Sequence, residues 1–166
     1  MALLRLSWFP HRTWLNWRRR RQRARGEEGS PLVGLLDAPL PDLDADWTET
    51  EYVVLDFETT GLDPRDDRLL SAGWVVMRGP SIDLATAEHD LIRPEMAIPE
   101  ASAVIHRITD DRAATGRPER EVLAEVLDAL AGRVLVAHNA RFEIAFLGAA
   151  CRRHFGAVPI VPMNGS

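Results

Sequence analysis

The stretch V-V-L-D-F-E-T-T-G-L (residues 53–62) sets two carboxylates into an apolar run. The run begins at Tyr52, is rich in β-branched and aromatic residues and ends in turn-forming residues, which predicts a strand covered on both faces. Alternate side chains of a strand share a face, so Asp56 and Glu58 should lie together, with Cα atoms about 6.6 Å apart. Burying two like charges without partners costs several kcal/mol each. The pair therefore predicts a divalent-cation site.

From residue 47 onward the pattern is that of an α/β domain. Strands are expected at 52–57, 69–77 and 87–92, and their short connections favour an antiparallel meander. Helices are expected at 99–105, 118–132 and 139–155, the last capped by Asn139, with a buried strand at 134–137 between the last two. A fifth strand is expected to begin at 159–161. The sequence has no internal repeats.

Charge is distributed unevenly over the 166 residues. The first 25 carry eight arginines and no acid, whereas the remainder has a net charge of −13. Residues 1–25 also contain Trp8, Phe9, Trp14 and Trp17. This segment could bind nucleic acid, with arginines on phosphates and tryptophans stacked on bases, lie on anionic lipid, or form a poorly ordered tail. We expect a basic tail at 1–25, a Pro- and Gly-containing linker at 26–46 and the main domain at 47–166.

The single cysteine, Cys151, excludes an intrachain disulfide and is expected to be a packing residue. The N-terminus lacks the apolar stretch of a signal peptide or membrane span. These features predict a cytoplasmic protein.

A third acid, Glu143, is expected in the first turn of the 139–155 helix. Taken alone, it reads as a helix-start acid favoured by the macrodipole, an effect of about 0.3–1 kcal/mol. Taken with Asp56 and Glu58, it supplies an oxygen donor from a second element, as a two-metal site requires.

Three stretches together resemble one family: L-D-F-E-T-T-G-L at 55–62, I-H-R-I-T at 105–109 and A-H-N-A-R-F-E at 137–143. They are similar to the DEDD 3′–5′ exonucleases, in the branch with a catalytic histidine, whose best-known member is the proofreading epsilon subunit of bacterial DNA polymerase III. The first and third stretches match the family's first two motifs. The resemblance covers about residues 47–161 and implies an RNase H-like fold, a mixed five-stranded sheet flanked by helices.

The resemblance also implies a reaction. Asp56, Glu58 and Glu143 would hold two Mg²⁺ or Mn²⁺ ions, hard cations that suit oxygen-only ligands. One ion would activate the water that attacks the terminal phosphodiester, and the other would stabilise the leaving 3′ oxygen. The implied substrate is a single-stranded or frayed 3′ end, of DNA in preference to RNA, and the implied partner is a polymerase.

Substrate contacts follow from the same resemblance, and each has a structural alternative. The turn Thr59-Thr60-Gly61 would receive the 3′-terminal nucleotide. Leu62 would wedge against the terminal base or simply anchor the turn, and Phe142 would offer a stacking surface or pack in the core. His106 and Asn139 would contact the substrate, or serve as a surface residue and as a helix cap.

Two departures from the family pattern bear on activity. The second motif normally has Asp where this chain has Glu143, and a third motif, a histidine and an aspartate about five residues apart, is not found after Phe155. His138 and His154 do not match that motif. We therefore expect a domain incomplete at its C-terminus, with weak or absent activity and poor solubility or self-association. The alternative is a non-catalytic nucleic-acid-binding module with a decayed site, relying on its arginine tail.

Overall fold

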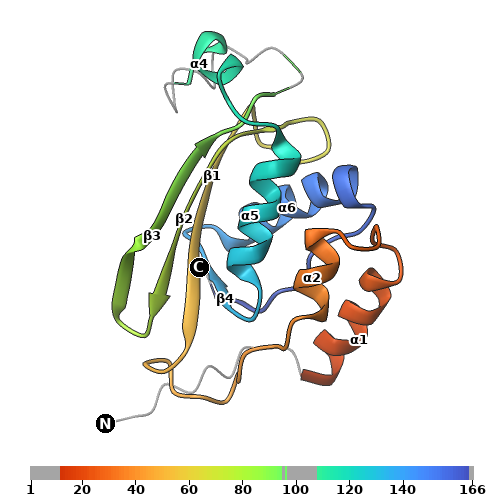
Figure 1. Ribbon diagram of the computed structural model, residues 1–166, viewed down its shortest axis with the longest axis vertical. Helices are drawn as coiled ribbons and strands as arrows, with labels where there is room; N and C mark the ends of the chain where they lie inside the picture. Colours follow the sequence, from red (N-terminus) through yellow and green to blue (C-terminus); the bar gives the residue numbers. More distant parts are fainter. Residues whose placement is uncertain (1–11, 95, 97–107, 165–166) are drawn as a thin grey trace.

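The computed structural model describes residues 12–94, 96 and 108–164, which form helices packed on a mixed sheet (Figure 1). The helices are α1 (Arg12–Arg23), α2 (Pro31–Asp37), α4 (Asp110–Ala114), α5 (Glu119–Leu130) and α6 (Ala140–Phe155). The strands are β1 (Glu51–Thr59), β2 (Leu69–Arg78), β3 (Ser81–Leu91), β4 (Val134–Val136) and β5 (Met163–Asn164).

The five strands lie in the order β3-β2-β1-β4-β5. β1, β2 and β3 form the predicted antiparallel meander, and β4 and β5 add to the other edge in parallel register. The predicted α/β class and mixed sheet flanked by helices are thus confirmed. β3 begins six residues before the expected 87, β5 follows the expected 159–161, and the helix expected at 99–105 lies outside the described residues.

Residues 12–46, expected to be a basic tail and a linker, instead contain two helices that join the core. Ser30 caps α2, accepting a hydrogen bond from the Val33 N–H at 3.4 Å, and Pro31 occupies its first turn. The helix then buries Leu32, Leu35 and Leu36 in the same cluster as the strands and α5. Figure 1 shows α2 beside α5, and α1 beside α2. A domain boundary near residue 47 remains a prediction.

Arg19 joins the two N-terminal helices and is only 6% exposed. Its guanidinium donates to the Leu36 carbonyl at 3.1 Å, to the Ala38 carbonyl at 2.7 Å and to the Leu35 carbonyl. These carbonyls lie at the C-terminal end of α2, where no later N–H group of the helix is available to bond to them. The positive charge therefore completes the C-terminus of α2 and fixes α1 against it.

Replacing Arg19 by alanine should lower the free energy of unfolding by about 2 kcal/mol, because buried carbonyls lose charged donors. Urea denaturation measures this loss. Arg20→Ala is the matched control, since Arg20 is the exposed next residue of the same helix. Equal unfolding midpoints for the two variants would contradict the anchoring role of Arg19.

Among the described residues, a helical core covers one face of the sheet. Val53, Leu55 and Phe57 of β1 are buried in that core with Cys151 of α6, where burial raises the pKa of the thiol, as suits a packing residue. The alternate residues of β1 point to the other face. There the half-buried Val54 lies in register with two further half-buried valines, Val75 of β2 and Val136 of β4. The predicted covering of both faces is therefore wrong in the described part of the chain.

The described residues contain no helix that is both long and apolar enough to cross a membrane.

Candidate active site

Asp56 and Glu58 share the open face of β1, as their alternation predicted. Asp56 is exposed and Glu58 is half-buried, so the expectation that both would be buried is wrong. The reason is that the described helices pack on the face of Val53, Leu55 and Phe57. Water can therefore solvate the two charges, and a ligand can approach them from the open side.

Glu143 meets this pair from a second element. It lies in the first turn of α6, is 4% exposed, and its Oε2 accepts a hydrogen bond from the Phe57 N–H at 3.1 Å. β4 pairs with β1 only along residues 52–54, so the Phe57 N–H lies beyond the end of the ladder. The Glu143 carboxylate occupies that position and brings the second acidic stretch against the first.

Burial raises the pKa of Glu143 to about 8, and the charge of Asp56 and, more weakly, that of Glu58 add to the rise. The hydrogen bond from Phe57 acts in the opposite direction. The Glu143 carboxylate is thus close enough to Asp56 and Glu58 for their charges to repel it. A bound cation would relieve that repulsion.

The donor set suits a hard divalent cation because all three side chains offer carboxylate oxygens. The Phe57 hydrogen bond engages only one oxygen of Glu143. Within residues 12–94, 96 and 108–164, however, no three His, Cys, Asp or Glu side chains stand together in a group that could hold a metal ion as placed. Ligation by all three acids therefore requires their side chains to move toward a common point.

The strand register adds two residues that the sequence alone did not single out. Asp56 pairs with Gly73 of β2, and Gly73 pairs with His89 of β3, so all three positions face the open side. A Cβ atom on Gly73 would lie 3.6 Å from His89 Cδ2, an ordinary contact distance. Gly73 therefore leaves the strand position between Asp56 and the exposed His89 without a side chain. Only the pairing register reveals this arrangement, and no local sequence signal encodes it.

Filling that space should separate stability from activity. We expect Gly73→Val to keep or slightly raise the melting temperature, because valine favours a strand and meets no close contact. The isopropyl group would nevertheless obstruct the approach to Asp56 and slow 3′-end shortening at least about tenfold. Thermal melts and gel assays test both parts, with Gly34→Ala in α2 as the control glycine, since nothing lies near its added Cβ. Unchanged activity in Gly73→Val would show that the open face beside Asp56 is not the approach route.

The turn after β1 is organised by its own side chains. Thr59 Oγ1 donates to the Gly61 carbonyl at 2.6 Å, and Thr60 Oγ1 donates to Asp67 Oδ1 at 2.9 Å. A Cβ atom on Gly61 would meet the Asp67 carboxylate, so another residue there would displace that carboxylate from its bonds to Thr60 and to the Asp63 N–H. Leu62 is 83% exposed, which disfavours its alternative role as a buried turn anchor. The threonine hydroxyls hold the turn, and Leu62 projects from it.

Two of the remaining candidate substrate contacts, Asn139 and Phe142, lie at the start of α6. Asn139 caps the helix by accepting from the Phe142 N–H at 3.3 Å, so its structural role is confirmed. Phe142 is half-buried, with its ring centroid 4.6 Å from that of Phe146. His106 lies outside the described residues. His154 pairs with Glu119 at 2.6 Å, eleven residues and thus about 16 Å along α6 from Glu143.

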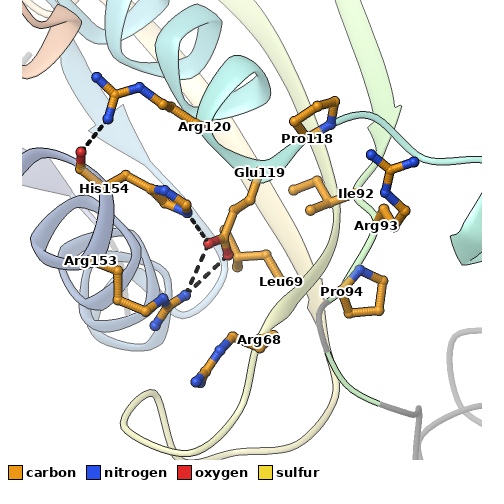
Figure 2. A pocket seen from close by; sticks show the side chains of 10 residues that line it. All are labelled: Arg68, Leu69, Ile92, Arg93, Pro94, Pro118, Glu119, Arg120, Arg153 and His154. Carbon is orange, nitrogen blue, oxygen red and sulfur yellow. Dashed lines mark hydrogen bonds and ion pairs between the residues drawn. The ribbon is translucent and has the colours of Figure 1, made fainter.

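A separate hollow of about 530 Å³ lies between the start of β2, the end of β3, the start of α5 and the end of α6. Figure 2 shows Arg153 and His154 both turned toward Glu119, while the guanidinium groups of Arg68 and Arg93 point apart. Glu119 is the only acid among its lining residues. Since it contains none of the three candidate carboxylates, this hollow is not the predicted metal site.

Comparison with known proteins assigns the family. Residues 53–164 match the family described as Exonuclease (RNase T), so the chain belongs to this exonuclease family. It is 40% identical over 118 residues to a PolC-type DNA polymerase III of Thermotoga maritima, covering 70% of this chain and 8% of that protein. It is 36% identical over 98 residues to the DNA polymerase III epsilon subunit of Treponema pallidum, covering 59% of this chain and 45% of that subunit.

The fold is that of solved exonuclease I structures. A product-bound exonuclease I aligns with a TM-score of 0.60 at 18% identity, over 64% of this chain and 26% of the other. E. coli exonuclease I in complex with a dA16 oligonucleotide aligns with a TM-score of 0.59 at 17% identity, over 64% and 24% of the two chains. The predicted RNase H-like exonuclease fold is thereby confirmed. The chain is thus an exonuclease-family domain similar to part of DNA polymerase III proteins, and it spans less than half the length of the relatives named above.

Proposed function

We propose that this chain acts in a metal-dependent 3′–5′ exonuclease reaction, releasing nucleoside monophosphates from the 3′ end of a DNA strand. The observation that supports this most is the hydrogen bond from the Phe57 N–H to Glu143, which joins the two acidic stretches across 86 positions of sequence. DNA is the favoured substrate because the relatives are DNA polymerase III proteins and exonuclease I is solved with an oligonucleotide. A polymerase partner is expected on the same ground.

Asp56, Glu58 and Glu143 would hold two Mg²⁺ or Mn²⁺ ions, which when bound supply an activated water and stabilise the leaving 3′ oxygen. Asp56 and Glu58 present their carboxylates on the open face, and the Phe57 N–H orients that of Glu143. A zinc-bound form of E. coli exonuclease I with single-stranded DNA is among the similar structures, which agrees with a metal-binding fold of this kind.

The substrate would lie over the turn after β1. The backbone of Thr59, Thr60 and Gly61 would receive the 3′-terminal nucleotide, since the two threonine hydroxyls are already engaged within the turn. The exposed Leu62 would wedge against the terminal base, and the half-buried ring of Phe142 would stack on it. Asn139 and His106 are proposed as further contacts on the substrate side.

Hydrolysis by these residues should be slow. The sequence after Phe155 contains neither histidine nor acid, so no general base of the family's third motif is present in it. Such a base contributes about 10²–10⁴-fold. Glu143 also has one methylene more than the usual aspartate, and a productive site tolerates only about 0.5 Å of slack.

A 5′-labelled single-stranded oligonucleotide, incubated with the chain in Mg²⁺, in Mn²⁺ and in EDTA, tests the proposal. We expect a slow ladder of products shortened from the 3′ end in Mn²⁺ and none in EDTA. Matched DNA and RNA oligonucleotides report the sugar preference. A ladder that persists in EDTA, or shortening from the 5′ end, would contradict the proposal.

A non-catalytic nucleic-acid-binding module is the second candidate function. It is favoured by the absence of a preformed metal cluster among the described residues and by the basic helix α1 docked on the core. Binding without cleavage in either metal, even with protein in excess over the oligonucleotide, would select this function.

A further inference from the structure

Helix α1 presents two tryptophans and two arginines on one face. Trp14 is 44% exposed and Trp17 is 52% exposed. Helical spacing places Trp14, Trp17, Arg18 and Arg21 side by side, because residues three, four and seven apart share a face. We call these four residues the Trp/Arg face.

Each tryptophan of the Trp/Arg face carries an arginine over its ring. The guanidinium carbon of Arg18 lies 4.7 Å from the Trp14 ring centroid, and that of Arg21 lies 4.8 Å from the Trp17 centroid. Each guanidinium covers one side of its ring, and the exposed fractions show that much of each ring still meets solvent. The face therefore offers flat aromatic surface and positive charge together.

The positive charge is not neutralised within the described part of the chain. α1 contains no acid in its first turn, and of its arginines only Arg23 forms ion pairs there, with Glu28 and Asp37. Arg18 and Arg21 thus remain available to an anionic ligand.

The Trp/Arg face is held outward by the opposite side of the helix. Leu15 is buried in the core, and Arg19 binds the carbonyls at the end of α2. Gln22 Oε1 also accepts from the Val158 N–H at 3.2 Å, which ties the end of α1 to the segment after α6. The four side chains therefore sit on an anchored helix rather than on a loose tail.

We propose that the Trp/Arg face binds single-stranded nucleic acid, with bases stacking on the two rings and phosphates paired with the two guanidinium groups. Neighbouring helix positions three apart lie about 5–6 Å from each other, so the rings can take two successive bases. The inference goes beyond the proposed function, because it needs neither a metal ion nor the three carboxylates. It assigns the domain a second point of contact with a strand.

A single strand fits this face better than an anionic lipid surface does. A helix lying in a membrane interface keeps a continuous apolar side separate from its basic side. In α1 the apolar Leu15 is turned into the core, and the tryptophans are interleaved with arginines on the outward face. Interleaved aromatic and cationic groups are typical of surfaces that bind unpaired bases and backbone.

Fluorescence anisotropy of a labelled oligothymidine, titrated with the full chain in EDTA, tests the inference without cleavage. We expect Trp14→Ala/Trp17→Ala to weaken binding at least about tenfold, while Trp14→Phe/Trp17→Phe retains most of it. Arg18→Gln/Arg21→Gln should reduce the salt slope of log K by about 1.4, the effect of two fewer phosphate contacts on a single strand. Trp47→Ala, at another equally exposed tryptophan, is the control and should bind as wild type does.

The outcomes separate this inference from the proposed function. Wild-type affinity in the Trp14→Ala/Trp17→Ala variant, with a normal melt, would overturn the inference even if the chain cleaves DNA. Binding that depends on the two rings and persists in Asp56→Asn would support it even if no cleavage is found. If Trp14→Ala/Trp17→Ala no longer sediments with phosphatidylserine vesicles but binds the oligonucleotide as wild type does, the face binds membranes. That result would overturn the inference as well.

Discussion

Asp56→Asn is expected to reduce metal-dependent 3′-end shortening by about 10³-fold or more. The substitution keeps the side-chain shape and removes one charge from the open face, where no core packing depends on it. A cation in such a site contributes several kcal/mol of transition-state stabilisation, and each 1.36 kcal/mol is a tenfold change in rate. Single-turnover assays in Mn²⁺ with excess protein make the comparison measurable even when wild-type hydrolysis is slow.

Asp66→Asn is the matched control for Asp56→Asn. Asp66 is an exposed aspartate in the turn that follows β1, outside the proposed set of ligands. Asp66→Asn should leave the rate of 3′-end shortening within about twofold of wild type. Both variants should have the melting temperature of wild type or a slightly higher one. Equal activity of Asp56→Asn and wild type would remove Asp56 from the site.

Glu143→Gln is expected to change how stability depends on pH and metal. In the folded protein the Glu143 pKa is raised to about 8 from an ordinary value of 4.5, chiefly by burial. Between these two values the folded state holds a proton that the unfolded state has released, so wild-type stability falls as pH rises. The fall is about 1.4 kcal/mol per pH unit, and it is complete above pH 8.

Glutamine removes this titration but still accepts a hydrogen bond from Phe57. In EDTA the variant should therefore match wild type near pH 4.5 and exceed its unfolding free energy by about 4 kcal/mol near pH 8. Manganese should stabilise wild type by mass action, about 2.7 kcal/mol at a hundredfold excess over Kd, and the variant much less. Urea denaturation at several pH values measures both effects, with Glu49→Gln, at an exposed glutamate, as the control. Parallel pH profiles for Glu143→Gln and wild type would refute the buried, charge-coupled position of Glu143.

Local patterns were sufficient to predict the meander and the helices α5 and α6, whereas the meeting of the two acidic stretches was expected from the family resemblance. The alternation in β1 correctly placed Asp56 and Glu58 on one face, because successive side chains of a strand point to opposite faces of the sheet. The Asn139 cap was likewise readable, since an N-cap depends only on the residues beside it.

Features that depend on tertiary packing were missed. The apolar run of β1 does not reveal which face a helix covers, so the open side of Asp56 was not foreseen. Gly and Pro content predicts a linker over residues 26–46, whereas the structure begins α2 at the Ser30 cap and packs the helix against α5. The approach of His89 to the Asp56 face depends on strand register across Gly73, which no local pattern specifies.

Titration of the chain with Mn²⁺, followed by the electron paramagnetic resonance signal of the free ion, tests the central claim most directly. The claim is that Asp56, Glu58 and Glu143 together form a site for divalent cations. Wild type should remove up to two ions per chain from the free signal, and Asp56→Asn should remove fewer or none at the same concentrations. Equal binding by the two proteins, or no binding by wild type at millimolar Mn²⁺, would contradict the claim.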